Sequence, residues 1–226
     1  MKKKDGFSPE WENIYKSNIH LSIWPWTEVV SLVNLFCKNT KIFRNVLEIG
    51  CGAGANIPFF LSRAYRYYGI DGSKIIIDRL KKKFSIIKDQ LIVSDFTQEI
   101  LINKKFDLII DRGSLTHNTF NDIGKALQIL SKKTRKGGIY IGVDLFSSMH
   151  TSSKLGKKID SFTRSKINTP QFRNVGNVHF FTKESIIKLF KKNDFKILML
   201  EHVSKKNLFK KKLERNCVFN MVAKKI

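Results

Sequence analysis

The sequence predicts an α/β protein built on one doubly wound, mainly parallel seven-stranded sheet, with an antiparallel last strand and helices on both faces. Short runs of β-branched and apolar residues alternate with segments whose apolar residues recur at helical spacing. This alternation is typical of parallel strands joined by right-handed helical crossovers. A length of 226 residues suits one sizeable domain, so we expect a single domain over residues 1–226.

Five parallel strands are expected, each ending in a polar or glycine-rich turn: 46–49, 67–70, 91–93, 106–110 and 139–145. Asn56 is placed to cap the helix over 57–63, and Ser73 to cap the next helix. Gly137 and Gly138 are expected to stop the helix that follows the fourth strand. Two last strands, 195–200 and 217–223, are expected to pair antiparallel and to close one edge of the sheet.

Two segments fall outside this alternation. Residues 1–44 are expected to form an N-terminal helical cap, in which Trp11, Tyr15, Trp24 and Trp26 are aromatic. The connection after the fifth strand, 147–181, far exceeds the usual roughly 2 to 6 residues, and connections of that length are usually lids or binding elements. We therefore expect a substrate lid. Its basic residues outnumber the single acid Asp160, and they are Lys154, Lys157, Lys158, Arg164, Lys166 and Arg173.

The chain is strongly basic, with 42 Lys and Arg against 19 Asp and Glu and a formal net charge of +23. Such a field attracts polyanions, but the lysines come in short runs beside apolar patterns, which favours solvated faces of helices and strands. No apolar stretch is long enough for a signal peptide or a membrane span, so we expect a cytoplasmic protein with no membrane insertion. Cys37, Cys51 and Cys217 are scattered and are expected to be reduced.

The segment Glu48-Ile49-Gly50-Cys51-Gly52-Ala53-Gly54 is the most informative stretch, because a buried strand ends there in three alternating glycines. Glycine lets the backbone approach a ligand closely, so a small cofactor is expected above this turn. Spacing alone leaves two cofactors open. Gly50, Gly52 and Ala55, with Asp71 some twenty residues on, also satisfy a nicotinamide fingerprint. Glu48, the long segment before the first strand and the polar turn after the fourth strand count against that reading.

Four motifs in order, each at the end of an expected strand, resemble those of class I S-adenosylmethionine-dependent methyltransferases of the small-molecule type, over residues 45 to 226. The glycine turn resembles the first motif, Gly69-Ile70-Asp71-Gly72-Ser73 the second, Ser94-Asp95-Phe96 the adenine site, and Asp111-Arg112-Gly113-Ser114 the fourth.

The resemblance implies S-adenosylmethionine as cofactor and S-adenosylhomocysteine as product. It implies that Asp71 accepts hydrogen bonds from the ribose hydroxyls, that Asp95 accepts from the adenine amine, and that Phe96 packs on the ring. The cofactor-binding residues that it implies are Tyr15, Trp24, Glu48, Gly50, Cys51, Gly52, Gly54, Asn56, Asp71, Gly72, Ser73, Asp95, Phe96, Asp111 and Arg112.

Methyl transfer from a sulfonium requires alignment and exclusion of water, and no metal is expected. A base accelerates transfer to a hydroxyl by roughly 10² to 10⁴. We expect His117 or His179 in that role, with His20 and His150 as further candidates. His150, Lys157, Lys158 and Arg173 are expected to bind the acceptor.

A basic lid over the cofactor site favours a small anionic acceptor, a sugar, nucleotide-linked or phosphorylated metabolite, methylated on O or N. The N-terminal aromatic cluster resembles that of enzymes encoded with bacterial surface-polysaccharide genes. Two alternatives stay open: an RNA methyltransferase that uses the positive charge, and a non-catalytic S-adenosylmethionine-binding regulatory protein. Either a monomer or a homodimer fits the sequence.

Overall fold

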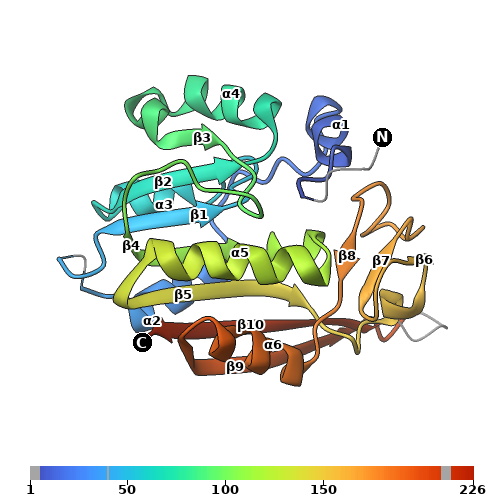
Figure 1. The fold of residues 1–226 in the computed structure, drawn as a ribbon. Coiled ribbons are helices and arrows are strands. Elements are labelled where there is room, and N and C mark those ends of the chain that lie inside the picture. Colours follow the sequence, from blue (N-terminus) through green and yellow to red (C-terminus); the bar gives the residue numbers. More distant parts are fainter. Residues whose placement is uncertain (1–5, 40, 210–214) are drawn as a thin grey trace.

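The central sheet has seven strands in the order β3-β2-β1-β4-β5-β10-β9 (Figure 1). The computed structural model describes residues 6–39, 41–209 and 215–226. β1 to β5 run parallel to one another, whereas β10 is antiparallel to both β5 and β9. This confirms the predicted mainly parallel sheet with an antiparallel last strand. The strands are β1 (Asn45–Ile49), β2 (Arg66–Asp71), β3 (Leu91–Val93), β4 (Phe106–Arg112), β5 (Thr134–Phe146), β9 (Phe195–Lys206) and β10 (Arg215–Lys225).

The antiparallel pair differs in detail from the prediction. β10 inserts between β5 and β9, so β9 is the edge strand, and both strands are longer than predicted. β5 also begins earlier than predicted. The preceding helix ends at Lys133, before Gly137 and Gly138, so these glycines do not stop it. They lie inside β5, where the pairing with β4 shifts in register between Phe106 and Leu108.

Helices cover both faces of the sheet, as predicted. α5 (Phe120–Lys133) and α6 (Lys183–Lys192) pack on one face, and α2 (Thr27–Phe36), α3 (Ile57–Ser62) and α4 (Lys74–Lys83) on the other. Each face has its own cluster of buried apolar side chains. Burial of these faces is what holds the sheet between the two helical layers.

The two predicted helix caps have different outcomes. Ser73 caps α4, because its hydroxyl accepts a hydrogen bond from the Ile76 amide. The cap assigned to Asn56 is wrong: its side chain makes no capping bond to α3. The Asn56 side chain is buried, and its amide donates instead to the Glu48 carboxylate in β1.

The two irregular segments meet at the carboxyl ends of the parallel strands. α1 (Glu10–Lys16) and the small sheet of β6 (Lys157–Lys158), β7 (Thr163–Ser165) and β8 (Val178–His179) lie at that end in Figure 1. A third apolar cluster joins them, since Ile14 and Trp11 of α1 pack with Phe172, Val175 and Phe180. Residues 1–5 and 40 of the predicted N-terminal cap lie outside the described residues.

The three cysteines are buried free thiols, as the sequence predicts. Among the described helices, none is both long and apolar enough to cross a bilayer.

Candidate functional site

A cavity of about 530 Å³ opens at the carboxyl ends of β1, β2, β3 and β4. Ligands in open α/β sheets bind at this edge, where the strand order reverses, and this volume is that of a small-molecule pocket. The cavity contains most of the predicted cofactor-binding residues. Those that line it are Tyr15, Glu48, Gly50, Cys51, Gly52, Asn56, Asp71, Gly72, Asp95, Phe96 and Arg112.

The glycine turn after β1 forms the floor of the cavity. Gly50 has φ of +57°, and a Cβ there would collide with the Ser114 hydroxyl, which donates to the carbonyl of Ile49 at 2.9 Å. Only glycine combines this backbone conformation with so close an approach. Ser114 of the motif after β4 therefore fixes the turn after β1 by this hydrogen bond, and both motifs line the same part of the cavity.

Glu48 lies at the end of β1 and is buried. Its carboxylate accepts hydrogen bonds from Asn56 Nδ2 at 2.8 Å and from the Tyr67 hydroxyl at 2.6 Å. Burial raises the pKa of Glu48 to about 7, against the lowering effect of these two bonds. No described basic side chain forms an ion pair with it. A cationic group in the cavity would satisfy this carboxylate.

Asp71 lies at the end of β2 and is also buried. Its two oxygens accept the amide N–H groups of Gly52 at 3.0 Å and Ser73 at 2.9 Å, so it joins the turns after β1 and β2. Burial raises the pKa of Asp71 to about 6. A carboxylate has about four acceptor positions, so oxygen sites remain for a ligand that donates hydroxyl hydrogens.

Asp95, after β3, is held by the segment that precedes α1. Its Oδ2 accepts the Phe7 amide at 2.7 Å, and its Oδ1 accepts from the amide and hydroxyl of Thr97. The Phe7 ring lies on Gly72, where an added Cβ would overlap it. Glu12 fastens α1 further, accepting from the Ser73 hydroxyl at 2.7 Å and the Lys74 amide at 2.9 Å. The N-terminal segment thus covers this end of the cavity.

Arg112 lies at the end of β4 and is already paired. It forms an ion pair with Asp144 of β5 at 2.8 Å, and its guanidinium lies 3.4 Å from the centre of the Trp26 ring. Asp144 adopts φ of +57°, an uncommon conformation for a residue other than glycine. The pair and the stacked ring form a rigid wall beside His117.

His117 lines the cavity in the short helix after β4. Its Nδ1 lies 3.3 Å from the carbonyl oxygen of Asn177, which can only accept, so Nδ1 carries the hydrogen and Nε2 keeps its lone pair. Trp11 packs edge-on against the ring at 4.8 Å. Burial lowers the pKa of His117 to about 4, so the imidazole is neutral near pH 7.

Three predicted cofactor residues support the cavity without lining it. Asp111 is fully buried and accepts from the Ser114 amide and the Tyr140 hydroxyl, which shapes the turn after β4. Ser73 caps α4, and Gly54 faces Leu80 and Ile57. Trp24 is 76% exposed and lies apart from the cavity, whereas its neighbour Trp26 lines it.

Of the other predicted histidines, His20 lines the cavity beside Trp11, whereas His179 does not line it. His179 is buried in β8, and its Nδ1 lies 2.8 Å from the Thr163 hydroxyl, which itself donates to Asp160. Phe120 stacks on its ring at 5.8 Å. These contacts make His179 a packing residue of the small sheet, outside the cavity lining.

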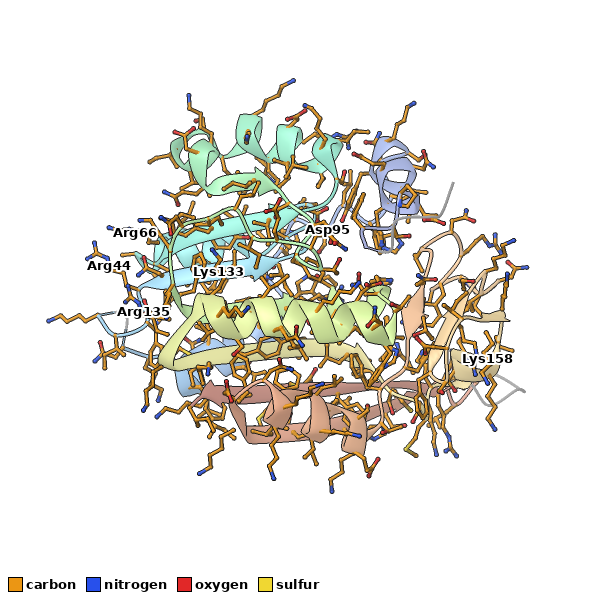
Figure 2. All side chains as sticks on the ribbon, in the orientation of Figure 1. Arg44, Arg66, Asp95, Lys133, Arg135 and Lys158 are labelled. Atoms are coloured by element: carbon orange, nitrogen blue, oxygen red, sulfur yellow. The ribbon has the colours of Figure 1, made fainter. Side chains whose placement is uncertain are left out.

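The predicted acceptor-binding residues also lie away from the cavity. Lys157 and Lys158 are exposed on β6, and Lys158 points outward at the far side of the molecule in Figure 2, well away from Asp95. Arg173 is exposed, and His150 is buried behind the cavity wall. The 147–181 connection instead lines the cavity through Gln171, Phe172 and Val175.

The sequence interpretation missed several lining residues, most of them uncharged. Asn118 follows β4 closely and could have been found from its place just after a strand end, beside the fourth motif that includes Ser114. Phe146, Gln171, Phe172, Val203 and Val218 carry no local signal, because only long-range packing brings them to the cavity. Within the described residues, no cluster of three His, Cys, Asp or Glu side chains could hold a metal ion.

Comparison with known proteins supplies the family. A family model described as "Methyltransferase domain" matches residues 24–200. The chain belongs to this methyltransferase family. No curated protein matches the sequence with significance.

Solved structures share the fold of this methyltransferase. An S-adenosylmethionine-dependent methyltransferase from Clostridium acetobutylicum is 17% identical to this chain and has a TM-score of 0.66. The alignment covers 95% of this chain and 96% of the other. One from Methanosarcina mazei is 16% identical, with coverage of 91% and 99% and a TM-score of 0.68. The 1,6-didemethyltoxoflavin-N1-methyltransferase of Burkholderia thailandensis, solved with its acceptor and S-adenosylhomocysteine, is 17% identical, with coverage of 96% and 87% and a TM-score of 0.63. The sheet is that of class I methyltransferases.

Proposed function

We propose that this methyltransferase uses S-adenosylmethionine to methylate an O or N atom of a small molecule in the cavity. One observation carries the proposal: acidic side chains at the carboxyl ends of three adjacent parallel strands, Glu48, Asp71 and Asp95, line the same cavity as His117. Related structures with S-adenosylmethionine or S-adenosylhomocysteine bound support the choice of cofactor.

The residues present fit S-adenosylmethionine. Its ribose hydroxyls suit the acceptor sites of Asp71, and the ammonium group of its amino-acid end suits Glu48, a buried carboxylate without a described ionic partner. Phe96 offers an apolar surface to the adenine ring and Asp95 an acceptor to its amine. The bound sulfonium supplies the activated methyl group.

His117 then serves as the base for an acceptor with an O–H or N–H group. As the acceptor atom bonds to the methyl carbon and the carbon–sulfur bond breaks, the proton of the acceptor passes to Nε2 of His117. The carbonyl of Asn177 holds the Nδ1–H and keeps Nε2 directed away from it. Trp11 and the Phe7 segment exclude water from this end of the cavity.

We propose an uncharged acceptor in place of the anionic one that the basic lid suggested. Lys157, Lys158 and Arg173 do not line the cavity, and acidic residues outnumber basic ones there. The acidic lining residues are Glu28, Glu48, Asp71, Asp95 and Asp144, and the basic ones are Arg112 and Lys205. With Glu48, Asp71 and Asp95 facing the cofactor, Glu28 and Asp144 balance Arg112 and Lys205, so the lining leaves no net positive charge to bind an anion. The association with surface polysaccharides stays a prediction from the sequence.

The experiment is transfer of labelled methyl from S-adenosylmethionine to fractionated cell metabolites, with total RNA as a separate acceptor. Label in a low-molecular-weight fraction is expected. Label in RNA instead would overturn the small-molecule assignment, and binding of S-adenosylmethionine without label in any fraction would favour a regulatory protein.

A further inference from the structure

Gln171 is the one polar side chain that the long connection sends to the cavity. The backbone turns at this point, where the amides of Phe172 and Arg173 both donate to the carbonyl of Thr169. Phe172 is buried in the third apolar cluster and fixes the turn. Gln171 itself is exposed at the mouth, so it can meet a ligand that enters.

The orientation of the Gln171 amide follows from its neighbour His150. The Ser152 amide donates to His150 Nδ1 at 3.0 Å. Because an N–H can only donate, Nδ1 is unprotonated, and the neutral ring carries its hydrogen on Nε2. Nε2 lies 3.2 Å from Gln171 Oε1 and donates to it. The amide oxygen of Gln171 is thereby occupied.

The tautomer of His150 is held by its surroundings. The ring packs against Phe172, Phe180 and Phe146, with centroids 5.2, 5.8 and 6.1 Å away. Burial lowers the pKa of His150, which keeps the ring neutral at physiological pH. With its oxygen fixed, Gln171 has two N–H donors left, and within the described residues nothing accepts from them.

Gln171 and His117 therefore present opposite hydrogen-bonding groups to the same cavity. His117 offers the lone pair of Nε2, whereas Gln171 offers N–H groups. The Phe146 ring lies 6.1 Å from the His117 ring and 4.8 Å from the ring of Phe172, the neighbour of Gln171 in the chain. With Trp11 and Trp26, these rings give the acceptor end of the cavity flat apolar surfaces.

We propose that Gln171 determines acceptor specificity and that His150 is its positioning residue. Gln171 donates to an oxygen of an uncharged, planar acceptor, while the O–H or N–H group of that acceptor that is methylated faces His117. A neutral carbonyl oxygen fits, because Gln171 is itself uncharged, the long connection brings no cationic side chain into the cavity, and Arg112 is already paired with Asp144. This inference rests on the proposed function, and it adds the chemical class of the acceptor.

The test uses 2-, 3- and 4-hydroxybenzamide as probes, each compared with the hydroxybenzoate of the same substitution. Binding to the full-length protein is measured by saturation-transfer NMR in the presence of S-adenosylhomocysteine. At least one hydroxybenzamide should bind five times or more tighter than its benzoate. Failure of all three amides, or equal or tighter binding of the benzoates, would overturn the proposal.

Variants test the two residues. Gln171→Ala and Gln171→Glu should each lower the affinity for the hydroxybenzamide that the wild type binds at least fivefold. His150→Phe should lower it by a similar factor, and the double variant Gln171→Ala/His150→Phe should show no further loss of affinity. The matched control is Asn168→Asp, an exposed amide of the same connection outside the cavity lining, which should change nothing. An unchanged affinity in Gln171→Ala would overturn the role of Gln171.

Two readouts separate this inference from the proposed function. Nitrogen NMR of His150 should find the proton on Nε2, and a proton on Nδ1 would contradict the assigned orientation of Gln171. Calorimetry with S-adenosylhomocysteine should give the same dissociation constant for wild type, Gln171→Ala and His150→Phe. If the wild type does not bind S-adenosylhomocysteine, the proposed function fails; if it binds while every hydroxybenzamide fails, only this inference does.

Discussion

The cavity and the outer surface of the 147–181 connection differ in charge. The charged residues that line the cavity are mainly acidic, within a chain of net charge +23, while the connection exposes Lys157, Lys158 and Arg173 to solvent. Figure 2 also places Arg44, Arg66, Lys133 and Arg135 at the opposite end of the sheet, far from Asp95. The positive net charge therefore comes from solvent-exposed residues and gives no information on the ligand. The acidic residues at the ends of the strands do, because they line the cavity.

The largest effect is expected inside the cavity, at His117. His117→Ala should lower turnover by roughly 10² to 10⁴, because the base is lost, and should leave affinity for S-adenosylmethionine within about twofold. The measurement is label transfer to the metabolite fraction that the wild type methylates. His179→Ala is the comparison, and an equal loss of turnover with the cofactor affinity intact would return His179 to the chemistry.

A smaller effect is expected from the buried charge of Glu48. The pKa of Glu48 is about 7, so the carboxylate that would pair with the amino-acid end of the cofactor forms as pH rises through 7. Affinity for S-adenosylmethionine should therefore increase about five- to tenfold from pH 6 to pH 8. Asp71, with a pKa of about 6, adds a change of the same sign at the lower end of this range.

Calorimetry across this pH range checks the prediction. Glu48→Gln keeps the shape of the side chain and removes the titration: its oxygen still accepts from Asn56, and the Tyr67 hydroxyl turns to accept from the new amide N–H. Its affinity should therefore be weaker and vary much less with pH. A wild-type affinity that stays constant from pH 6 to pH 8 would exclude Glu48 as the partner of the cationic end.

The smallest effect is expected from the exposed charges of the 147–181 connection. Neutralising Lys157, Lys158 and Arg173 together should change neither cofactor affinity nor the KM for the methylated metabolite by more than about twofold, since exposed charges outside the cavity interact weakly through solvent. Steady-state kinetics at two salt concentrations measure this. A clear rise in KM would restore the anionic acceptor that the sequence suggested.

The same contrast explains what the sequence could predict. Glu48 lies within the apolar run of β1, and Asp71 and Asp95 stand at or just after the ends of β2 and β3. Parallel strands bring their carboxyl ends to one edge, so local patterns suffice to place these residues. Local patterns could not show that Trp26 rather than Trp24, and Gln171 rather than Lys157, lines the cavity. Which side of an irregular segment faces the cavity depends on packing of α1 against Phe172, Val175 and Phe180, residues more than 150 positions away in the chain.

His117 and His179 illustrate the limit most clearly. Both lie near strand ends in the sequence, and each bonds through Nδ1. One ring faces the cavity and the other is enclosed by Phe120 and Phe181, a difference that the chain order does not encode.

We propose that Asp71 binds the ribose of S-adenosylmethionine at the carboxyl end of β2, and calorimetric titration of Asp71 variants measures its contribution. Asp71→Ala should raise the dissociation constant at least about tenfold, because a charge-assisted hydrogen bond contributes roughly 1.5 to 3 kcal/mol. Asp71→Asn, which keeps the shape, should show a loss of the same sign, and the exposed Asp78→Ala should bind like the wild type. Unchanged affinity in correctly folded Asp71→Ala and Asp71→Asn would contradict the account.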